Sequence, residues 1–208
     1  MRFKDREDAG RKLAHELKNY DGAKDAVVIA LPRGGVAVGR VIADELHLPI
    51  DIVVPRKLGA PGHEEYAIGA LVESGEAVWN EKERGRFEPS ELEKIVHRER
   101  EEAIRRLSAY RSGRQPRDLK GKTVLLVDDG MATGYTLRAA LRTVRSERPG
   151  KIVVAVPVGP PDAVASLSSE ADEVIALHQP MSFFAIGEFY DDFRQVDDAA
   201  VIDMLSRP

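Results

Sequence analysis

Short, uninterrupted apolar runs of strand length recur along the chain, and most of them are followed by a segment with helical periodicity. The clearest runs are residues 26–31, 123–127 and 152–156, and shorter ones lie at 51–54 and 173–177. A run without polar alternation is expected of a strand buried on both faces. The alternation predicts an α/β fold, a doubly wound, mostly parallel sheet of about five strands flanked by helices. The predicted helices are 8–20, 36–46, 136–147 and 162–167.

Composition narrows the class of protein. The chain has 208 residues, enough for one well-filled domain, and its net charge of −4 gives no basic field for bulk nucleic-acid binding. The absence of cysteine excludes disulfides, thiolate nucleophiles and thiolate-bound metals. Residues 1–7 contain no apolar signal core and no run reaches membrane-spanning length, so a cytoplasmic protein is expected.

The remaining segments complete the predicted order of elements. Residues 56–66, rich in glycine, proline and charge, are predicted to be a loop. Residues 68–72 and 77–79 flank Ser74-Gly75 and predict a hairpin. A long helix is predicted over 89–111 from one apolar stripe, and a last helix over 199–205, which Asp197 and Asp198 would open. The stripe comprises Leu92, Ile95, Val96, Ala103, Leu107 and Tyr110.

Residues 124–136, with the sequence VLLVDDGMATGYT, carry the strongest chemical signal. A buried strand delivers Asp128 and Asp129 to its carboxyl end, where ligands bind in parallel sheets. Ionised carboxylates accept hydrogen bonds from neighbouring hydroxyl groups, such as those of a sugar. The small residues and threonines that follow lead into a helix, whose N-terminus favours a phosphate. The segment therefore predicts a site for a sugar phosphate.

Two structural and two functional alternatives exist for this segment. Paired aspartates can simply cap the next helix, and Thr-Gly-x-Thr can be an ordinary turn. A nucleoside-triphosphate loop is excluded because it requires a Gly-Lys-Ser/Thr sequence, and no lysine is present here. Acidic pairs of phosphoacceptor domains end the first strand, whereas this pair lies past the middle of the chain.

The thirteen residues resemble the phosphoribosyl-pyrophosphate (PRPP) signature of the type I phosphoribosyltransferases: four apolar residues, two acidic residues, then small residues and Thr-Gly-x-Thr. The resemblance implies that Asp128 and Asp129 bind the ribose 2- and 3-hydroxyls. It also implies one domain over residues 1–208, with a core at about 22–177, a flexible lid loop, and a small hood built from terminal segments. The hood would be residues 178–208, to which N-terminal residues could add. The 5-phosphate would be held by Gly130, Met131, Ala132, Thr133, Gly134, Tyr135 and Thr136.

Two further segments match sites of the family. Arg33, Gly34 and Gly35 follow the first strand at the position of the family's pyrophosphate loop, which often contains a cis non-proline peptide. A plain strand–helix turn is the alternative there. Arg56 and Lys57 resemble the start of the catalytic loop of orotate phosphoribosyltransferases. A further lysine of that loop would fall near Ala60, so His63 is the nearest candidate substitute. An exposed charged loop is the alternative reading.

The acceptor base is not identified by the sequence. Ala132 stands where 6-oxopurine enzymes usually have an aspartate, which disfavours hypoxanthine and guanine, and the incomplete lid leaves orotate open. Bases stack on aromatic rings, and residues 178–192 hold four candidates. Packing within the hood is the alternative, and we expect it for at least two of them. The four are Phe183, Phe184, Phe189 and Tyr190.

The resemblance implies a glycosyltransferase that moves 5-phosphoribose from PRPP to a nitrogenous base and releases pyrophosphate, in nucleotide and nucleoside metabolism. Arg33, Arg56 and Lys57 would neutralise the pyrophosphate. Mg²⁺ would be held mainly by PRPP, with Asp128 and Asp129 reaching it through water or hydroxyls, so no dedicated metal cage is predicted. Alternatives are a PRPP-sensing regulator and an enzyme acting on PRPP or a ribosyl phosphate without a free base. A homodimer would fit the family, and the 89–111 helix, otherwise unexplained, could support its interface.

Overall fold

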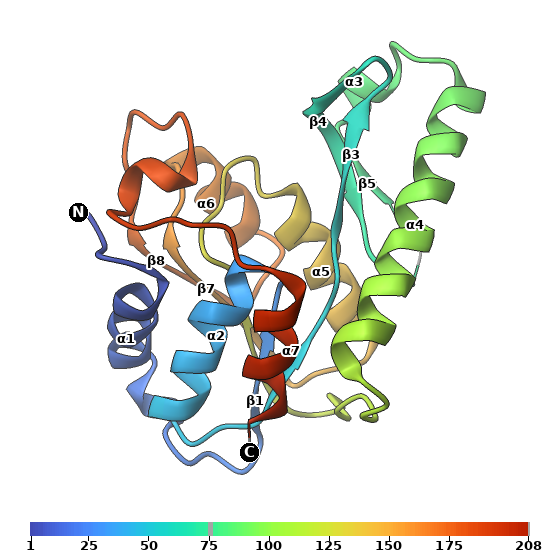
Figure 1. Ribbon diagram of the computed structural model, residues 1–208. Coiled ribbons are helices and arrows are strands. Elements are labelled where there is room, and N and C mark those ends of the chain that lie inside the picture. The colour runs from blue at the N-terminus through green and yellow to red at the C-terminus, as the bar shows by residue number, and fades with distance from the viewer. Residues whose placement is uncertain (75–76, 208) are drawn as a thin grey trace.

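The central layer of the protein is a five-stranded parallel sheet (Figure 1), seen in a computed structural model that describes residues 1–74 and 77–207. The strand order is β2-β1-β6-β7-β8, and every pair is parallel. The predicted α/β fold with a parallel sheet of about five strands is confirmed. The strands are β1 (Ala26–Ala30), β2 (Ile50–Ile52), β6 (Thr123–Val127), β7 (Lys151–Val158) and β8 (Glu173–His178).

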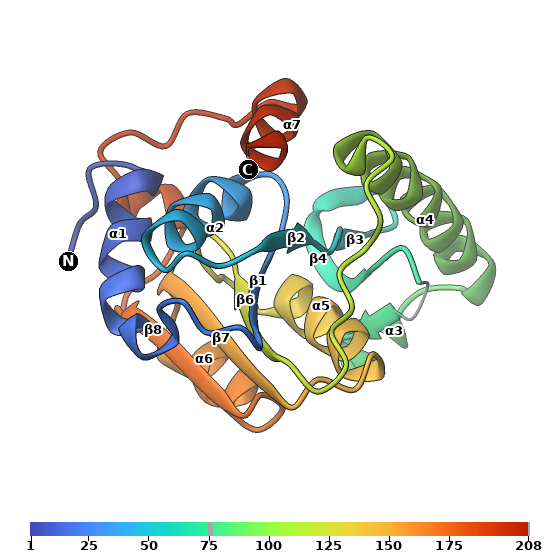
Figure 2. The same ribbon diagram turned by 90° about the horizontal axis from the view of Figure 1, so that it is seen from below.

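Helices cover both faces of this sheet (Figure 2). Along β6, Leu125 and Val127 belong to the core cluster shared with α1, α2 and α7, whereas Val124 and Leu126 pack with α5. Successive strand residues point to opposite faces, so a strand covered twice must be apolar at every position. This is why the runs lack polar alternation. The helices are α1 (Arg6–Glu16), α2 (Gly34–Glu45), α5 (Tyr135–Ser146), α6 (Pro161–Ser168) and α7 (Asp198–Ser206).

A second, antiparallel sheet stands beside the central one and comprises β3 (Arg56–Ala60), β4 (His63–Leu71) and β5 (Ala77–Trp79). The predicted loop over 56–66 is therefore wrong, because β3 and β4 form a hairpin that turns at Pro61 and Gly62. Backbone pairing does not depend on side-chain type, so glycine and charge did not prevent it. The predicted β4–β5 hairpin is confirmed by pairing of Leu71 with Ala77, and its tip at Gly75 lies outside the described residues.

The long helix α4 (Pro89–Arg111) packs on the antiparallel sheet after the short helix α3 (Glu81–Arg84), as Figure 1 shows. Its last turns also contact α7, where the Tyr110 hydroxyl donates a 2.7 Å hydrogen bond to Asp198. The predicted helix over 89–111 is confirmed. Asp197 caps α7 as expected, since its Oδ1 accepts from the backbone N–H of Ala200 at 2.7 Å.

The N-terminus joins the segment that follows β8. Phe3 forms a bridge with Tyr190, and its backbone N–H donates to the Phe189 carbonyl at 2.8 Å. Two 3-10 helices, η1 (Lys18–Tyr20) and η2 (Ile186–Phe189), complete the elements in the part of the chain that the structure describes. No helix in that part has the length and apolar character needed to cross a bilayer.

Candidate functional site

Asp128 and Asp129 lie directly after β6, at the carboxyl edge of the central sheet. Asp129 is buried, and its Oδ2 accepts a 2.7 Å hydrogen bond from Nε of Arg6, the first residue of α1. Asp128 is partly buried, and its Oδ1 accepts from the backbone N–H of Asp129 at 2.8 Å. These two hydrogen bonds therefore hold the carboxylates of Asp128 and Asp129 in fixed orientations at the end of β6.

The two carboxylates carry an electrostatic cost that the fold only partly relieves. Burial raises the pKa of Asp128 well above its usual range, and the neighbouring charge of Asp129 raises it further. Burial also raises the pKa of Asp129, although the charge of Arg6 and its hydrogen bond act to lower it. Acidic groups that favour protonation gain from a ligand that presents hydroxyls or a cation to them.

The residues after the carboxylates form an open N-terminus of α5. Gly134, in the position before the helix, has φ +76°, a left-handed conformation that suits glycine, and no side chain caps the helix there. Ala132 and Thr133 are exposed, whereas Met131 is buried and anchors the loop to Val158 through its backbone N–H at 2.8 Å. The first N–H groups of α5 thus lack a side-chain acceptor at a place where a phosphate would be stabilised.

The loop after β1 packs tightly against the carboxylates. The Pro32–Arg33 peptide bond is cis, in agreement with the resemblance. A Cβ on Gly34 would lie 1.8 Å from Asp129 Oδ2, and a Cβ on Gly35 would lie 2.9 Å from the Asp128 Cα. Only glycine fits at either position, so the loop and the acidic pair form one continuous surface. Arg33 lies 3.7 Å from Asp198 of α7.

Arg56 and Lys57 begin β3, at the foot of the antiparallel sheet. Arg56 is held by Glu99 of α4, with Nη2 2.8 Å from Oε2, and Lys57 is exposed. His63 pairs with Ala60 at the other end of β3, about 13 Å along the strand from Arg56 at ~3.3 Å per residue. The structure therefore does not bring His63 together with Arg56, although the sequence placed both in one catalytic loop.

The aromatic residues after β8 divide into packed and exposed ones. Phe183 and Phe189 stack with their ring centroids 5.4 Å apart, and Tyr190 is buried beside Phe3. The Tyr190 hydroxyl donates a 2.7 Å hydrogen bond to the Asp129 carbonyl oxygen. Packing of at least two of the four rings was expected, and three of them pack. Phe184, with 85% of its surface exposed, is the one free to meet a ligand.

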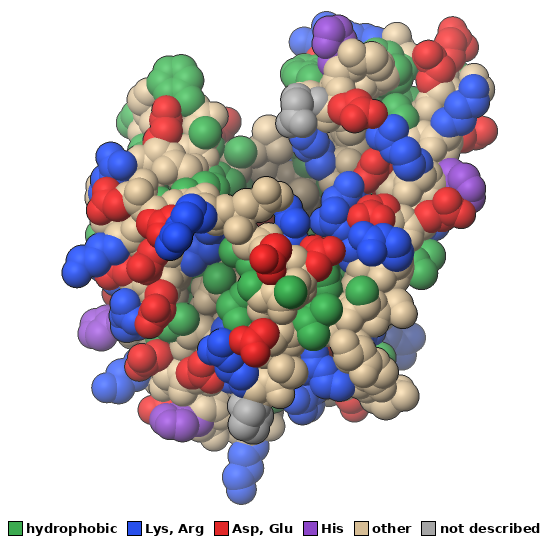
Figure 3. Space-filling model, in the orientation of Figure 1, with side chains coloured by type: hydrophobic (Ala, Val, Ile, Leu, Met, Phe, Trp, Pro, Cys, Tyr) green, Lys and Arg blue, Asp and Glu red, His purple; other side chains and the backbone are tan. Residues whose placement is uncertain are grey.

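A hollow separates two lobes of the molecule above the central sheet (Figure 3). One lobe is the segment after β8, and the other is the antiparallel sheet with α4 (Figure 1). Lys and Arg side chains gather at the foot of the second lobe (Figure 3). A ligand resting on the carboxyl edge of the sheet would thus meet acidic groups beneath it and cationic groups to one side.

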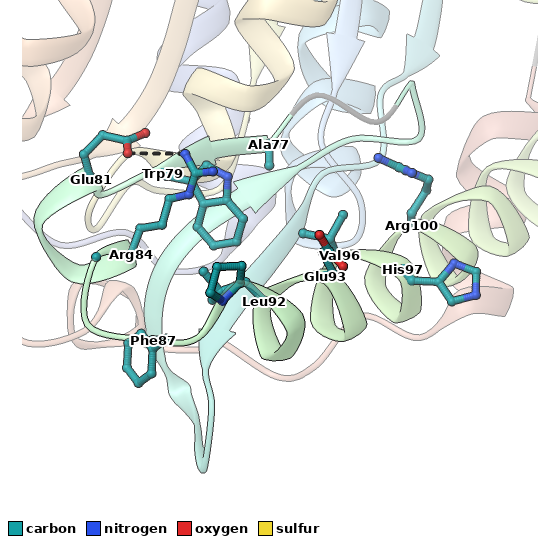
Figure 4. A pocket seen from close by; sticks show the side chains of 12 residues that line it. Ala77, Trp79, Glu81, Arg84, Phe87, Leu92, Glu93, Val96, His97 and Arg100 are labelled. Carbon is teal, nitrogen blue, oxygen red and sulfur yellow. Dashed lines mark hydrogen bonds and ion pairs between the residues drawn. The ribbon is translucent and has the colours of Figure 1, made fainter.

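A separate cavity of about 730 Å³ lies between β5, α3 and α4 (Figure 4). Trp79, Leu92 and Val96 give it an apolar wall, and Arg84 lies over the Trp79 ring at 5.5 Å from its centroid. None of the site residues predicted from the sequence lines this cavity. It reflects incomplete cover of β5 by α4 and stands apart from the acidic pair.

Several site residues were missed by the sequence analysis. Arg6 reaches Asp129 from 123 positions away, Glu99 holds Arg56, and Asp198 faces Arg33. Arg6 and Glu99 lie on helices among other charged residues, so no local pattern marks them, and Asp198 was assigned only to the start of the last helix. Across residues 1–74 and 77–207, no group of three or more His, Cys, Asp or Glu side chains is arranged to hold a metal ion.

Comparison with known proteins places the chain in a family. Residues 2–192 match the family model described as the phosphoribosyl transferase domain. A protein of Mycobacterium tuberculosis strain H37Rv, which carries the provisional name of a phosphoribosyl transferase, is 42% identical over 207 residues. The match covers 99% of this chain but 46% of the relative, so the chain spans about half of that protein's length.

Solved structures share the fold of the chain. The crystal structure of TT1426 from Thermus thermophilus is similar with a TM-score of 0.81 and 44% identity, covering 99% of this chain and 98% of that one. The AQ2163 protein of Aquifex aeolicus shares the fold alone, with a TM-score of 0.53 and 15% identity over 82% of this chain and 73% of that one. The chain belongs to the phosphoribosyl transferase domain family.

Proposed function

We propose that the protein is a Mg²⁺-dependent phosphoribosyltransferase that moves 5-phosphoribose from PRPP to a nitrogenous base and releases pyrophosphate. The observation that carries this proposal is the carboxylate pair, which packs against the uncapped N-terminus of α2 at Gly34–Gly35 and precedes the uncapped N-terminus of α5 in the chain. Asp128 and Asp129 would accept hydrogen bonds from the ribose hydroxyls. The uncapped start of α5 would hold the 5-phosphate, and the start of α2 with Arg33 would meet the pyrophosphate.

Catalysis in this proposal comes from positioning and charge. Breaking the bond from C1 to the pyrophosphate oxygen places negative charge on the leaving group and positive charge on the ribose ring. Arg33, Arg56 and Lys57 would stabilise the leaving group, and each well-placed donor of this kind can contribute about 3 kcal/mol. Arg56 lies on strand β3 rather than on a loop. Its guanidinium is oriented by an ion pair with Glu99. His63, at the hairpin tip, would reach the substrate only if the hairpin moved.

The carboxylate pair also fits a metal held mainly by its ligand. Mg²⁺ prefers oxygen donors and usually keeps several waters, and two carboxylates at one sheet edge supply such donors. When bound with PRPP, Mg²⁺ would supply charge neutralisation at the pyrophosphate. Asp128 and Asp129 would orient the hydroxyls that meet it, and Phe184 would offer an aromatic face to the base.

The test is calorimetric titration with PRPP and Mg²⁺, followed by a pyrophosphate-release screen over purines, pyrimidines and nicotinate-like acids. Saturable binding and base-dependent release are expected. Binding without release for every base would contradict the transferase and favour a PRPP-sensing regulator. Absence of binding would contradict both, and with them the assignment of the acidic pair.

The double variant Asp128→Asn, Asp129→Asn examines the pair directly. We expect it to lose PRPP binding by at least about 100-fold, because two charged acceptors of ribose hydroxyls become neutral amides, each worth about 1.5–3 kcal/mol. Asp203→Asn, an exposed substitution on α7, is the matched control and should bind normally. Circular dichroism of all three proteins checks that the fold is intact. Unchanged PRPP affinity in the double variant would refute the ribose assignment.

A further inference from the structure

Asp198, the first residue of α7, connects the loop after β1 to the long helix α4. Its Oδ1 accepts a 2.7 Å hydrogen bond from the hydroxyl of Tyr110 on α4, and the same oxygen lies 3.7 Å from Nη1 of Arg33. α7 lies between α2 and α4 and contacts both (Figure 1). One carboxylate oxygen is therefore shared between a buried tyrosine and the arginine of the candidate pyrophosphate loop.

The two contacts of Asp198 differ in strength. The hydrogen bond from Tyr110 is short and the Tyr110 side chain is buried, so this contact fixes the carboxylate. The 3.7 Å separation from Arg33 is longer than a direct hydrogen bond, and the side chains of Arg33 and Asp198 are 28% and 43% exposed. Arg33 is thus attracted to Asp198 without being locked to it, and its guanidinium can turn toward another anion.

The nearest cation of α4 is already paired with another carboxylate. Arg106 lies one helical turn before Tyr110, but its Nε donates to Glu102 at 2.6 Å. Among the Lys and Arg side chains of the described residues, Arg33 is the one that forms an ion pair with Asp198. Neutralising Asp198 therefore releases Arg33 and leaves the pairing of Arg106 with Glu102 in place.

We propose that Asp198 competes with pyrophosphate for Arg33 and so lowers the affinity of the site for this product. The inference rests on the proposed function, in which Arg33 meets the pyrophosphate. Pyrophosphate presents several charged oxygens to the guanidinium, whereas Asp198 presents one that it shares with Tyr110. Arg33 turns to pyrophosphate when the ligand binds and returns to Asp198 when it leaves. Asp198 is thus a positioning residue that acts through Arg33.

The test is a double-mutant cycle, measured by calorimetric titration with pyrophosphate and Mg²⁺. It compares the parent, Arg33→Gln, Asp198→Asn and the protein with both substitutions. Asp198→Asn keeps an oxygen that accepts from Tyr110, so the contact of α7 with α4 is retained. Asp203→Asn, which removes an exposed charge from the same helix, is the matched control. Circular dichroism checks the fold of each protein.

In Asp198→Asn we expect pyrophosphate to bind about three- to fivefold tighter, the range expected when one partly exposed ion pair no longer competes. Arg33→Gln should bind pyrophosphate more weakly than the parent, and adding Asp198→Asn to it should change nothing further. Asp203→Asn should bind as the parent does. Tyr110→Phe should bind pyrophosphate about twofold more weakly, because the released carboxylate can move closer to Arg33.

Unchanged or weaker pyrophosphate binding in Asp198→Asn would overturn the inference. An equal gain in the Arg33→Gln background would overturn it as well, because it would show that Asp198 repels the ligand directly. A loss of affinity in both Asp198→Asn and Tyr110→Phe would show a packing role alone. If Arg33→Gln binds pyrophosphate as tightly as the parent, or the parent does not bind it, the proposed function of this loop fails, and the inference fails with it.

Discussion

Glycine is required at positions 34 and 35 because the backbone there packs closely against the acidic pair, and not because of a turn conformation. A Cβ at position 34 would overlap a carboxylate oxygen of Asp129, and a Cβ at position 35 would press on the Asp128 backbone. The loop can therefore lie against the acidic pair only while these residues lack side chains. This gives a physical reason for the Gly34-Gly35 sequence, which was ambiguous between a ligand loop and a plain turn.

Gly34→Ala should weaken PRPP binding strongly while lowering stability by about 1–3 kcal/mol, the usual cost of overpacking. The added methyl group must displace Asp129 or the loop itself. Gly85→Ala is the matched control, because its Cβ would have only an ordinary 3.6 Å contact with the Glu81 carbonyl oxygen. Thermal unfolding and PRPP calorimetry on both variants make the comparison. Normal binding in Gly34→Ala would show that the loop and the carboxylates do not form one surface.

Residues adjacent in sequence were easier to predict than residues joined by folding. Asp128 and Asp129 follow a buried strand directly, so their place at the sheet edge could be inferred from the sequence. Arg6 shares no local signal with them, because the contact depends on how α1 packs against α2 and β7. Ion pairs between residues far apart in the sequence, such as Arg6 and Asp129, could not be predicted from local patterns.

At the scale of elements, the hairpin of β3 and β4 was the main error of the sequence analysis. Gly59, Pro61 and Gly62 suggested a loop, yet β3 pairs with β4 through Leu58 and Gly69. The pairing is supported by α4, whose Glu99 contacts both Arg56 and Arg98. Sequence patterns report single elements well, but here a helix much further along the chain stabilises the strand.

Glu99→Gln should weaken the attachment of α4 to strand β3. Its side chain is only 10% exposed, and the substitution removes the charge that two arginines share. We expect the free energy of unfolding to fall by about 1 kcal/mol, because Glu99 loses charge-assisted hydrogen bonds to two arginines whose side chains are 26% (Arg56) and 56% (Arg98) exposed. Hydrogen exchange of the β3 amides should also become faster.

Glu101→Gln is the control on the same helix, since the Glu101 side chain is 69% exposed and pairs only with His97 in the described residues. Its effect should stay within about 0.5 kcal/mol. If β3 exchanges equally in both variants, the ion pair does not hold the hairpin, and Arg56 is oriented by backbone pairing alone.

At the scale of the whole molecule, the N-terminal segment meets the segment after β8 beside the acidic pair. Phe3 pairs with Tyr190, and Tyr190 in turn donates to the Asp129 carbonyl. The sequence indicated the central sheet well because its strands are apolar at every position. A hood of terminal segments was expected only through the family resemblance, because the pairing of Phe3 with Tyr190 depends on a few contacts between residues far apart in the chain.

The carboxylate pair should also make the stability of the whole fold depend on pH. The pKa of Asp128 is raised well above 3.8 in the folded protein, so the folded state binds more protons than the unfolded chain from about pH 4 upward. Stability contributed by this group is full below pH 4 and is lost as the pH rises through the folded pKa. If the site binds ribose with both carboxylates ionised, the buried charge of Asp128 lowers the stability of the fold at neutral pH.

Asp128→Asn should therefore stabilise the protein at pH 8, because a neutral amide carries no charge to be desolvated by burial. The amide oxygen can still accept from the Asp129 N–H, so the local geometry is kept. The gain should shrink toward pH 4, whereas Asp203→Asn, on the exposed face of α7, should show no such trend. Urea unfolding from pH 4 to pH 8 measures both. A loss of stability in Asp128→Asn that grows with pH would mean that the folded protein favours the ionised form of this carboxylate.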